Sequence, residues 1–188
     1  LSPHILAGNG LTASHEACWL LDEQGKVLQR YLGDGWCTSL PAIAVADLNR
    51  DGVNTVFCGN NRGNLRAWAP HPAGDTSLWM RNLAGTIRSL TVVVRPQEKE
   101  NLIVVGSDSG YLVALDDKGD KAWGLPLSSA IIKTDLLSQV EGRSSLVVAG
   151  CKDGKVFIVS ADGKLSAIFD CSAQLRDLIC ADVDADQK

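Results

Sequence analysis

Short apolar runs recur along the chain, and each is closed by a glycine or by an acidic turn. In the clearest example, residues 102–105 and 112–115 are apolar throughout, and residues 107–110 between them combine serine, aspartate and glycine. Runs without strict alternation indicate strands that are covered on both faces. The residues between them suit a hairpin turn. The pattern therefore predicts antiparallel hairpins packed between neighbouring sheets.

The hairpin is repeated four times. The glycine that ends its first strand stands at Gly8, Gly59, Gly106 and Gly150, which gives spacings of 51, 47 and 44 residues. A third apolar segment follows each hairpin at residues 27–28, 78–79, 122–123 and 167–169, and a fourth at 43–45, 90–92, 136–137 and 178–180. Four strands at this period are typical of a propeller blade. We expect a nearly helix-free, all-β propeller of four-stranded antiparallel blades, with units near residues 1–52, 53–100, 101–144 and 145–188.

The two ends of the sequence belong to the same kind of blade. Residues 5–7 read as the second strand of a unit, and residues 178–181 read as the strand that starts another. Three arrangements fit: four blades that close on themselves, two copies paired into a larger ring, or a segment of a longer protein, which we favour. We expect the terminal strands to pair with each other or with another copy, because open sheet edges promote aggregation.

Two segments resemble known propeller repeats. The sequence GYLVALDDKGDKAW, at residues 110–123, resembles the quinoprotein-like (PQQ-type) repeat, in which a glycine turn leads to a tryptophan that docks between blades. The sequence ADLNRDGVNTVFCG, at residues 46–59, resembles the FG-GAP or VCBS-type repeat of integrin-like propellers. Both resemblances imply a propeller. Both families are functionally diverse, so the resemblance leaves the function open.

A possible calcium loop lies within the second of these segments. Asp47, Asn49 and Asp51 alternate along DLNRDG, and Gly52 permits the tight turn that a set of oxygen ligands needs. The integrin-like pattern has a further acid near the ninth position, where this chain has Thr55. Two interpretations stay open: a weak calcium site, and a turn in which the side chains cap backbone amides, which we favour. A second copy, with Gln187 in place of the glycine, stands at Asp182, Asp184 and Asp186.

A second candidate site consists of cations near the fourth strand of three units, Arg88, Lys133 and Arg176. In the quinoprotein-like arrangement this strand is the innermost, so the cations would converge on the axis and bind an anionic ligand or an acidic protein segment. The alternative is a set of ordinary ion pairs, since Asp135 and Asp177 follow closely. Among five tryptophans, Trp36 lies in a predicted loop and is the best binding candidate.

Composition narrows the function further. A net charge of −4 and a pI near 5.3 disfavour general nucleic-acid binding. No stretch approaches the roughly 18 apolar residues of a membrane span. The six cysteines include no C-x-x-C pair and no adjacent pair, so we expect free thiols, with a Cys18–Cys37 disulfide as the alternative in a secreted form.

No catalytic motif is recognisable, and we predict no catalytic residues. We predict a non-catalytic propeller scaffold that binds a protein or ligand on its loops and axial face. The alternative is a segment of a secreted carbohydrate-active or quinoprotein-type enzyme. A secreted or periplasmic location is favoured if a signal peptide has been removed.

Overall fold

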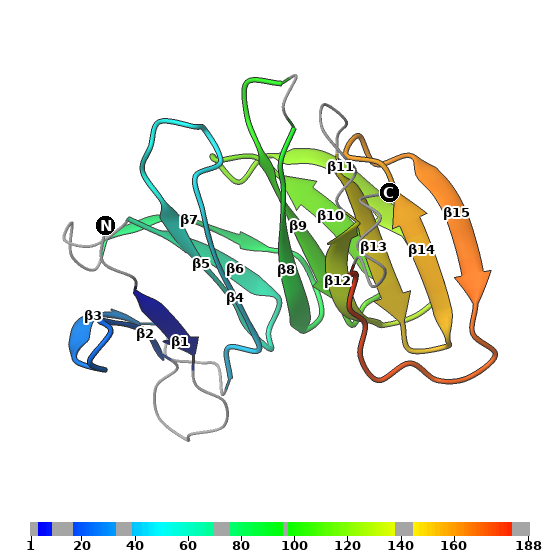
Figure 1. Cartoon of the computed structure of the whole chain (residues 1–188), viewed down its shortest axis with the longest axis horizontal. Helices are drawn as coiled ribbons and strands as arrows, with labels where there is room; N and C mark the ends of the chain where they lie inside the picture. Colours follow the sequence, from blue (N-terminus) through cyan, green and yellow to red (C-terminus); the bar gives the residue numbers. More distant parts are fainter. Residues whose placement is uncertain are drawn as a thin grey trace.

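The computed structural model contains strands and turns. It describes residues 4–8, 17–32, 39–69, 76–95, 98–137 and 145–181, and none of these residues is helical. The described residues accordingly include no helix that is long and apolar enough to cross a membrane. Four antiparallel sheets follow one another in chain order, from β1–β3 at one side of the molecule to β12–β15 at the other (Figure 1). The predicted all-β propeller architecture is confirmed.

Sheet 1 has three strands, and sheets 2, 3 and 4 have four each. Sheet 1 contains β1 (Ile5–Gly8), β2 (Ala17–Leu21) and β3 (Val27–Leu32). Sheet 2 contains β4 (Ala42–Ala46), β5 (Thr55–Gly59), β6 (Asn64–Trp68) and β7 (Ser77–Asn82). Sheet 3 contains β8 (Ile87–Val93), β9 (Leu102–Ser107), β10 (Tyr111–Leu115) and β11 (Lys121–Pro126). Sheet 4 contains β12 (Ile131–Leu137), β13 (Leu146–Cys151), β14 (Lys155–Val159) and β15 (Leu165–Asp170).

Each complete sheet takes its first strand from the end of one repeat unit and its other three strands from the next. The first strands, β4, β8 and β12, form one edge of their sheets and pack against one another, so they lie nearest the axis of the propeller. We call them the inner strands. Sheet 1 has no inner strand among the described residues.

The predicted strand at residues 178–180 is wrong, because this segment adopts no regular structure. It nevertheless lies where an inner strand would follow sheet 4: Leu175 and Leu178 approach Gly150, as Ile131 of β12 approaches Gly106 in the preceding sheet. The other inner strands are each held by the strand that follows in sequence, and no described strand follows this segment. Among the described residues, 178–181 form no strand that pairs with β1, which lies at the other side of the molecule (Figure 1).

Apolar side chains form a buried cluster in each of the three interfaces between neighbouring sheets, which we call the first, middle and last interface. The first interface contains a buried cluster around Tyr31 and Trp68. The middle interface packs Phe57 and Leu65 of sheet 2 against residues of sheet 3. The last interface includes Phe157 of sheet 4. Strands covered on both faces explain why the apolar runs of the sequence lack strict alternation.

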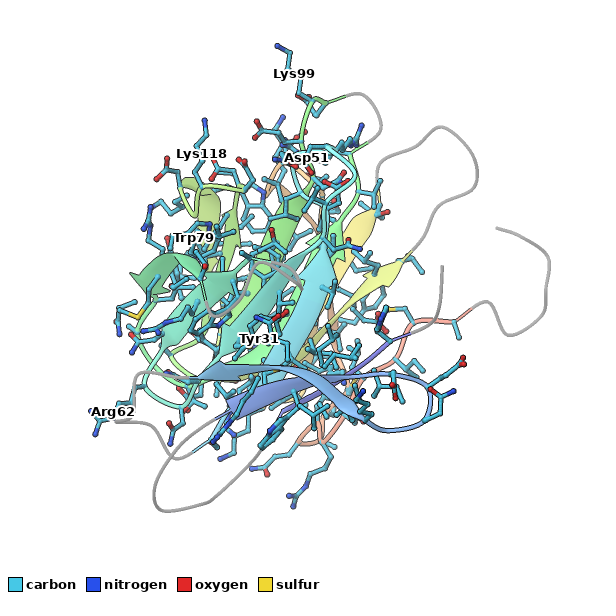
Figure 2. All side chains as sticks on the ribbon, turned by 90° about the vertical axis from the view of Figure 1, so that its left-hand side faces the viewer. Tyr31, Asp51, Arg62, Trp79, Lys99 and Lys118 are labelled. Carbon is cyan, nitrogen blue, oxygen red and sulfur yellow. The ribbon has the colours of Figure 1, made fainter. Side chains whose placement is uncertain are left out.

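A tryptophan joins neighbouring sheets at both the middle and the last interface. The Nε1 of Trp79 donates to the carbonyl of Asp117 at 2.6 Å, and that of Trp123 donates to the carbonyl of Ala161 at 2.8 Å. In each case the ring lies against a turn glycine with positive φ, Gly119 or Gly163, where an added Cβ would collide with the indole. Figure 2 shows Trp79 beneath the turn that carries Lys118.

Candidate functional site: an axial groove between the inner strands

A groove with a volume of about 440 Å³ runs across the three inner strands. Each of these strands is the edge of its sheet, so backbone groups as well as side chains are available along it. The lining comes from β4 with the residue before it, from β8 and from β12: Pro41, Ala42, Ile43, Arg88, Ser89, Leu90, Thr91, Lys133, Thr134, Asp135 and Leu136. The groove therefore contains two of the three cations that the sequence singled out.

Arg88 and Lys133 each face one carboxylate. The Nη2 of Arg88 lies 3.5 Å from Oδ2 of Asp108, and the Nζ of Lys133 lies 3.9 Å from Oδ1 of Asp177. The side chains of the two cations are 49% and 48% exposed. Exposed pairs at such distances contribute about 0–1 kcal/mol. Both cations are thus only loosely held by their partners.

The two cations do not occupy one repeated position. Gly59, Gly106 and Gly150 pair with Ala42, Ser89 and Lys133, respectively, so Lys133 corresponds to Ser89 rather than to Arg88. Arg88 is the extra residue at an irregularity in β8, between Ile87 and Ser89. The described lining of the groove does not include Arg176, which is exposed in the segment after β15. The expected convergence of three equivalent cations is therefore reduced to two inequivalent ones.

Asp135 is the acidic side chain within the groove. Its Oδ1 accepts a bond from the amide of Leu136 at 2.8 Å, and its Oδ2 accepts one from the amide of Cys180 at 2.7 Å. This carboxylate therefore fixes the irregular segment after β15 against β12. Both of its oxygens are engaged with the backbone, which leaves Lys133 to pair with Asp177.

A buried polar cluster lies between β8 and β12. Thr134 hydroxyl and backbone N–H both donate to Oγ of Ser89, at 2.8 and 3.0 Å, and its Oγ1 lies 2.6 Å from that of Thr91. All three side chains are buried. Hydrogen bonds that satisfy each other in a low dielectric hold the two strands in one register. The wall of the groove between sheets 3 and 4 is consequently fixed by side-chain bonds.

The loop of Asp47, Asn49 and Asp51 forms the turn that the sequence analysis favoured. Asp47 accepts from the amides of Asp51 and Gly52, at 3.1 and 2.9 Å, and Asp51 accepts from the amide of Val53 at 2.8 Å. Asn49 Oδ1 accepts from the Asp51 amide at 3.2 Å, while its Nδ2 donates to Asp51 Oδ2 at 3.0 Å. A cation would have to share these oxygens. Calcium binding here stays a prediction.

The same loop is tied to the next sheet through Asn101. The Nδ2 of Asn101 donates to the carbonyl of Asp47 at 3.0 Å, and its Oδ1 accepts from Nη2 of Arg50 at 2.8 Å. Figure 2 places Asp51 at the same edge of the molecule as Lys99. The motif therefore has a structural role at the middle interface, whatever it binds.

Sequence reasoning missed an acidic group at this edge. Carboxylate oxygens of Glu100, Asp116 and Asp117 lie within 4.8 Å of one another. Asp116 Oδ1 accepts from the amides of Lys118 and Asp120, and Oδ1 of Asp117 is buried without a hydrogen-bond partner. The three residues come from two separate turns of one sheet, and their spacing in sequence follows no metal-binding motif, so no sequence pattern revealed them.

Other predicted features are only partly described. Trp36, Cys37 and the second aspartate loop at Asp182, Asp184 and Asp186 lie outside the described residues. The five cysteines that the structure describes are all free thiols, Cys18, Cys58, Cys151, Cys171 and Cys180. Burial raises the pKa of Cys151, and burial together with Asp135 raises that of Cys180.

Solved structures with a similar fold are propeller proteins. The chain matches a crystal structure of BBS1N in complex with ARL6DN, with a TM-score of 0.65 and 14% identity over 92% of this chain and 52% of that one. It also matches Chaetomium thermophilum Sqt1 bound to the N-terminus of the ribosomal protein L10, with a TM-score of 0.65 and 15% identity over 85% of this chain and 49% of that one. At these identities the likeness shows the fold alone. The chain spans about half the length of these propellers.

No protein-family model matches the chain, and no curated protein sequence matches it significantly. The β-propeller fold is therefore established by architecture rather than by sequence.

Proposed function

We propose that this chain is a non-catalytic propeller segment that binds a partner protein along its axial groove, and that the partner contributes acidic side chains. The observation that carries the proposal is the presence of Arg88 and Lys133 in the lining of one groove, half-exposed and each held by a single long ion pair. A groove flanked by sheet edges suits an extended segment, because its backbone groups can pair with an edge.

The exchange of ion-pair partners is energetically feasible. Giving up the pairs with Asp108 and Asp177 costs about 0–1 kcal/mol each, since both are exposed. Hydrogen bonds from a cation to a carboxylate of the partner contribute about 1.5–3 kcal/mol when the contact is shielded from water. A bound protein segment would provide that shielding. Asp108 and Asp177 compete for the two cations. A partner must therefore place its own carboxylates close to both Arg88 and Lys133.

Similar folds support a binding role. One similar structure is a complex with ARL6DN, and another is bound to the N-terminus of a ribosomal protein. We also propose that the repeats are of the quinoprotein-like subtype. The interface contacts of Trp79 and Trp123, each with a glycine turn of the next sheet, support that assignment.

The test measures binding of a fluorescein-labelled hexaglutamate peptide by anisotropy, with hexaglutamine as the neutral probe. Replacing Arg88 and Lys133 together by glutamine should weaken hexaglutamate binding by about tenfold or more, and rising salt should weaken binding to the wild type. Lys164→Gln, an exposed lysine in the β14–β15 turn, is the matched control. Equal affinities for the double variant and the control would refute the role of the groove.

A further inference from the structure

A second pocket lies between sheets 2 and 3 and shares no lining residue with the axial groove. Its volume is about 450 Å³, within the range of small-ligand sites. The floor is apolar: Val113 and Leu115 are buried, and Leu83 and Tyr111 are half-buried. The outer strand β7, the β7–β8 loop, β10 and the β10–β11 turn form its walls. We call it the interblade pocket.

The next interface of the same molecule shows why this pocket exists. Val113 pairs with Val105, which precedes Gly106, and Phe157 pairs with Ala149, which precedes Gly150. Val113 and Phe157 therefore occupy the same position in successive sheets. Phe157 is only 6% exposed and fills the last interface. At the middle interface this position is Val113, and the phenyl ring of that interface belongs to Phe57 of sheet 2, which lies beside Trp79.

The opposite wall differs in the same way. Arg81 pairs with Leu65 of β6, and Leu125 pairs with Leu112 of β10, which is the equivalent position one sheet later. Leu125 packs on the apolar cluster of the last interface. The interblade pocket is thus formed by a Val and Arg pair where the last interface has Phe and Leu.

The guanidinium of Arg81 is fixed at the rim of the pocket. Its Nε donates to the carbonyl of Gly119 at 2.9 Å, and its Nη2 donates to that of Lys118 at 3.1 Å. The same Nη2 lies 3.3 Å from Oδ1 of Asp120, whose side chain is 70% exposed. With Lys121 also in the lining, the rim holds two cations and one exposed carboxylate. Its charge favours an anionic group.

We infer that the interblade pocket binds an extended segment of a partner protein that carries a phenylalanine next to an aspartate or glutamate. The phenyl ring takes the volume that Phe157 occupies at the last interface, and the neighbouring carboxylate meets Arg81 and Lys121. The choice of phenylalanine follows from Phe157, which fills the equivalent place at the last interface. The choice of an acidic neighbour follows from the two cations at the rim of the pocket. This site is separate from the axial groove and does not depend on it.

The probe is the peptide acetyl-Gly-Ser-Phe-Asp-Ser-Gly-amide, titrated into the full ¹⁵N-labelled chain and followed by two-dimensional NMR. Val113→Phe introduces into the pocket the residue found at the equivalent position of the last interface. We expect that variant to weaken peptide binding by about tenfold or more, because the anchor pocket is closed. Val27→Phe, at an exposed position of β3, is the matched control and should bind like the wild type.

Peptide variants separate the two halves of the inference. Replacing the peptide phenylalanine by alanine should abolish binding. Arg81→Leu, which copies Leu125, should retain the requirement for phenylalanine but lose the preference for aspartate over asparagine. Retained preference would overturn the assignment of the acid to Arg81.

Equal binding by wild type and Val113→Phe overturns the inference, as does a wild type that does not distinguish the phenylalanine and alanine peptides. If Val113→Phe does not fold, Val113→Met decides the matter, since a smaller group should give an intermediate loss and unchanged binding overturns the proposal. The double variant of Arg88 and Lys133 must bind this peptide normally. Failure of the axial groove is thereby distinguished from failure of the interblade pocket.

Discussion

The middle and last interfaces have the same architecture but distribute their polar and apolar groups in opposite ways. At the axial end, the middle interface is apolar, with Ala42, Ala44 and Leu90, whereas the last interface has the buried cluster of Ser89, Thr91 and Thr134. At the outer end the order reverses. The last interface is filled by Phe157 and Leu125, and the middle one is open beside Val113 and Arg81.

The contrast indicates that the fold needs dense packing in only part of each interface. The tryptophan contact is the same at both interfaces: Trp79 or Trp123 donates a hydrogen bond to a carbonyl in a turn of the next sheet. Because both interfaces share this contact, the side chains at the axial and outer ends of an interface can be replaced by others, provided that the volume is filled and buried polar groups keep hydrogen-bond partners. Binding sites can therefore occupy the less densely packed end without loss of the architecture.

The largest expected effect comes from equivalent truncations at the outer end. Phe157→Ala should destabilise the chain by about 3–5 kcal/mol, because it leaves a cavity in a filled interface. Val113→Ala should cost about 1–2 kcal/mol, since only two methyl groups are lost beside an existing pocket. Urea unfolding monitored by tryptophan fluorescence measures both. Equal costs would contradict the contrast between a filled and an open interface.

The axial end provides the second test. Ser89→Ala copies Ala42 but leaves the buried donors of Thr134 without their acceptor, which should cost about 1–3 kcal/mol. The triple variant S89A/T91A/T134L copies the apolar residues Ala42, Ala44 and Leu90 of the middle interface. It should recover part of this loss, because the hydroxyl groups are removed together, while the backbone N–H of residue 134 still lacks its acceptor. If the triple variant is less stable than Ser89→Ala, the axial ends of the middle and last interfaces are not exchangeable.

Much of this architecture was readable in the sequence. The glycine spacing and the apolar runs predicted the sheets, because a period of about one blade is a strong constraint, and the motif at residues 110–123 predicted the role of Trp123. The strand predicted at residues 178–180 failed, because strand formation depends on a neighbour and not only on apolar residues.

The sites were less predictable. Arg88 and Lys133 both line the groove, but they are not at equivalent positions. The inner strands β8 and β12 share the same one-residue irregularity, in which Arg88 corresponds to Ile132 and Lys133 corresponds to Ser89, and this offset is established by the strand register. The interblade pocket was not predicted at all. It follows from comparing Val113 with Phe157 at equivalent positions, and that equivalence requires the strand register.

Thiol reactivity gives a further comparison. Cys151 is buried at the last interface, and burial raises the pKa of its thiol, whereas Cys171 is exposed to the reagent. Iodoacetamide should therefore modify Cys171 at least about tenfold faster, as measured by peptide mass spectrometry. In Phe157→Ala the modification of Cys151 should accelerate, because the interface is opened. Comparable rates at both thiols in the wild type would contradict the dense packing of this interface.

The smallest expected effect concerns calcium at the Asp47 loop, which ties the middle interface together through Asn101. The loop oxygens already accept backbone amides, whereas calcium requires six to eight oxygen ligands, so we expect a dissociation constant of about 5 mM or weaker. At about 5 mM calcium the stabilisation is then at most about 0.4 kcal/mol. This corresponds to a rise in Tm of about 1 °C in a thermal melt.

Asp47→Ala should lower the Tm with or without calcium, because two amides lose their acceptor. A calcium-dependent rise of several degrees that Asp51→Ala abolishes would instead show that the loop is a metal site, and that the middle interface is held by an ion that the last interface does not need.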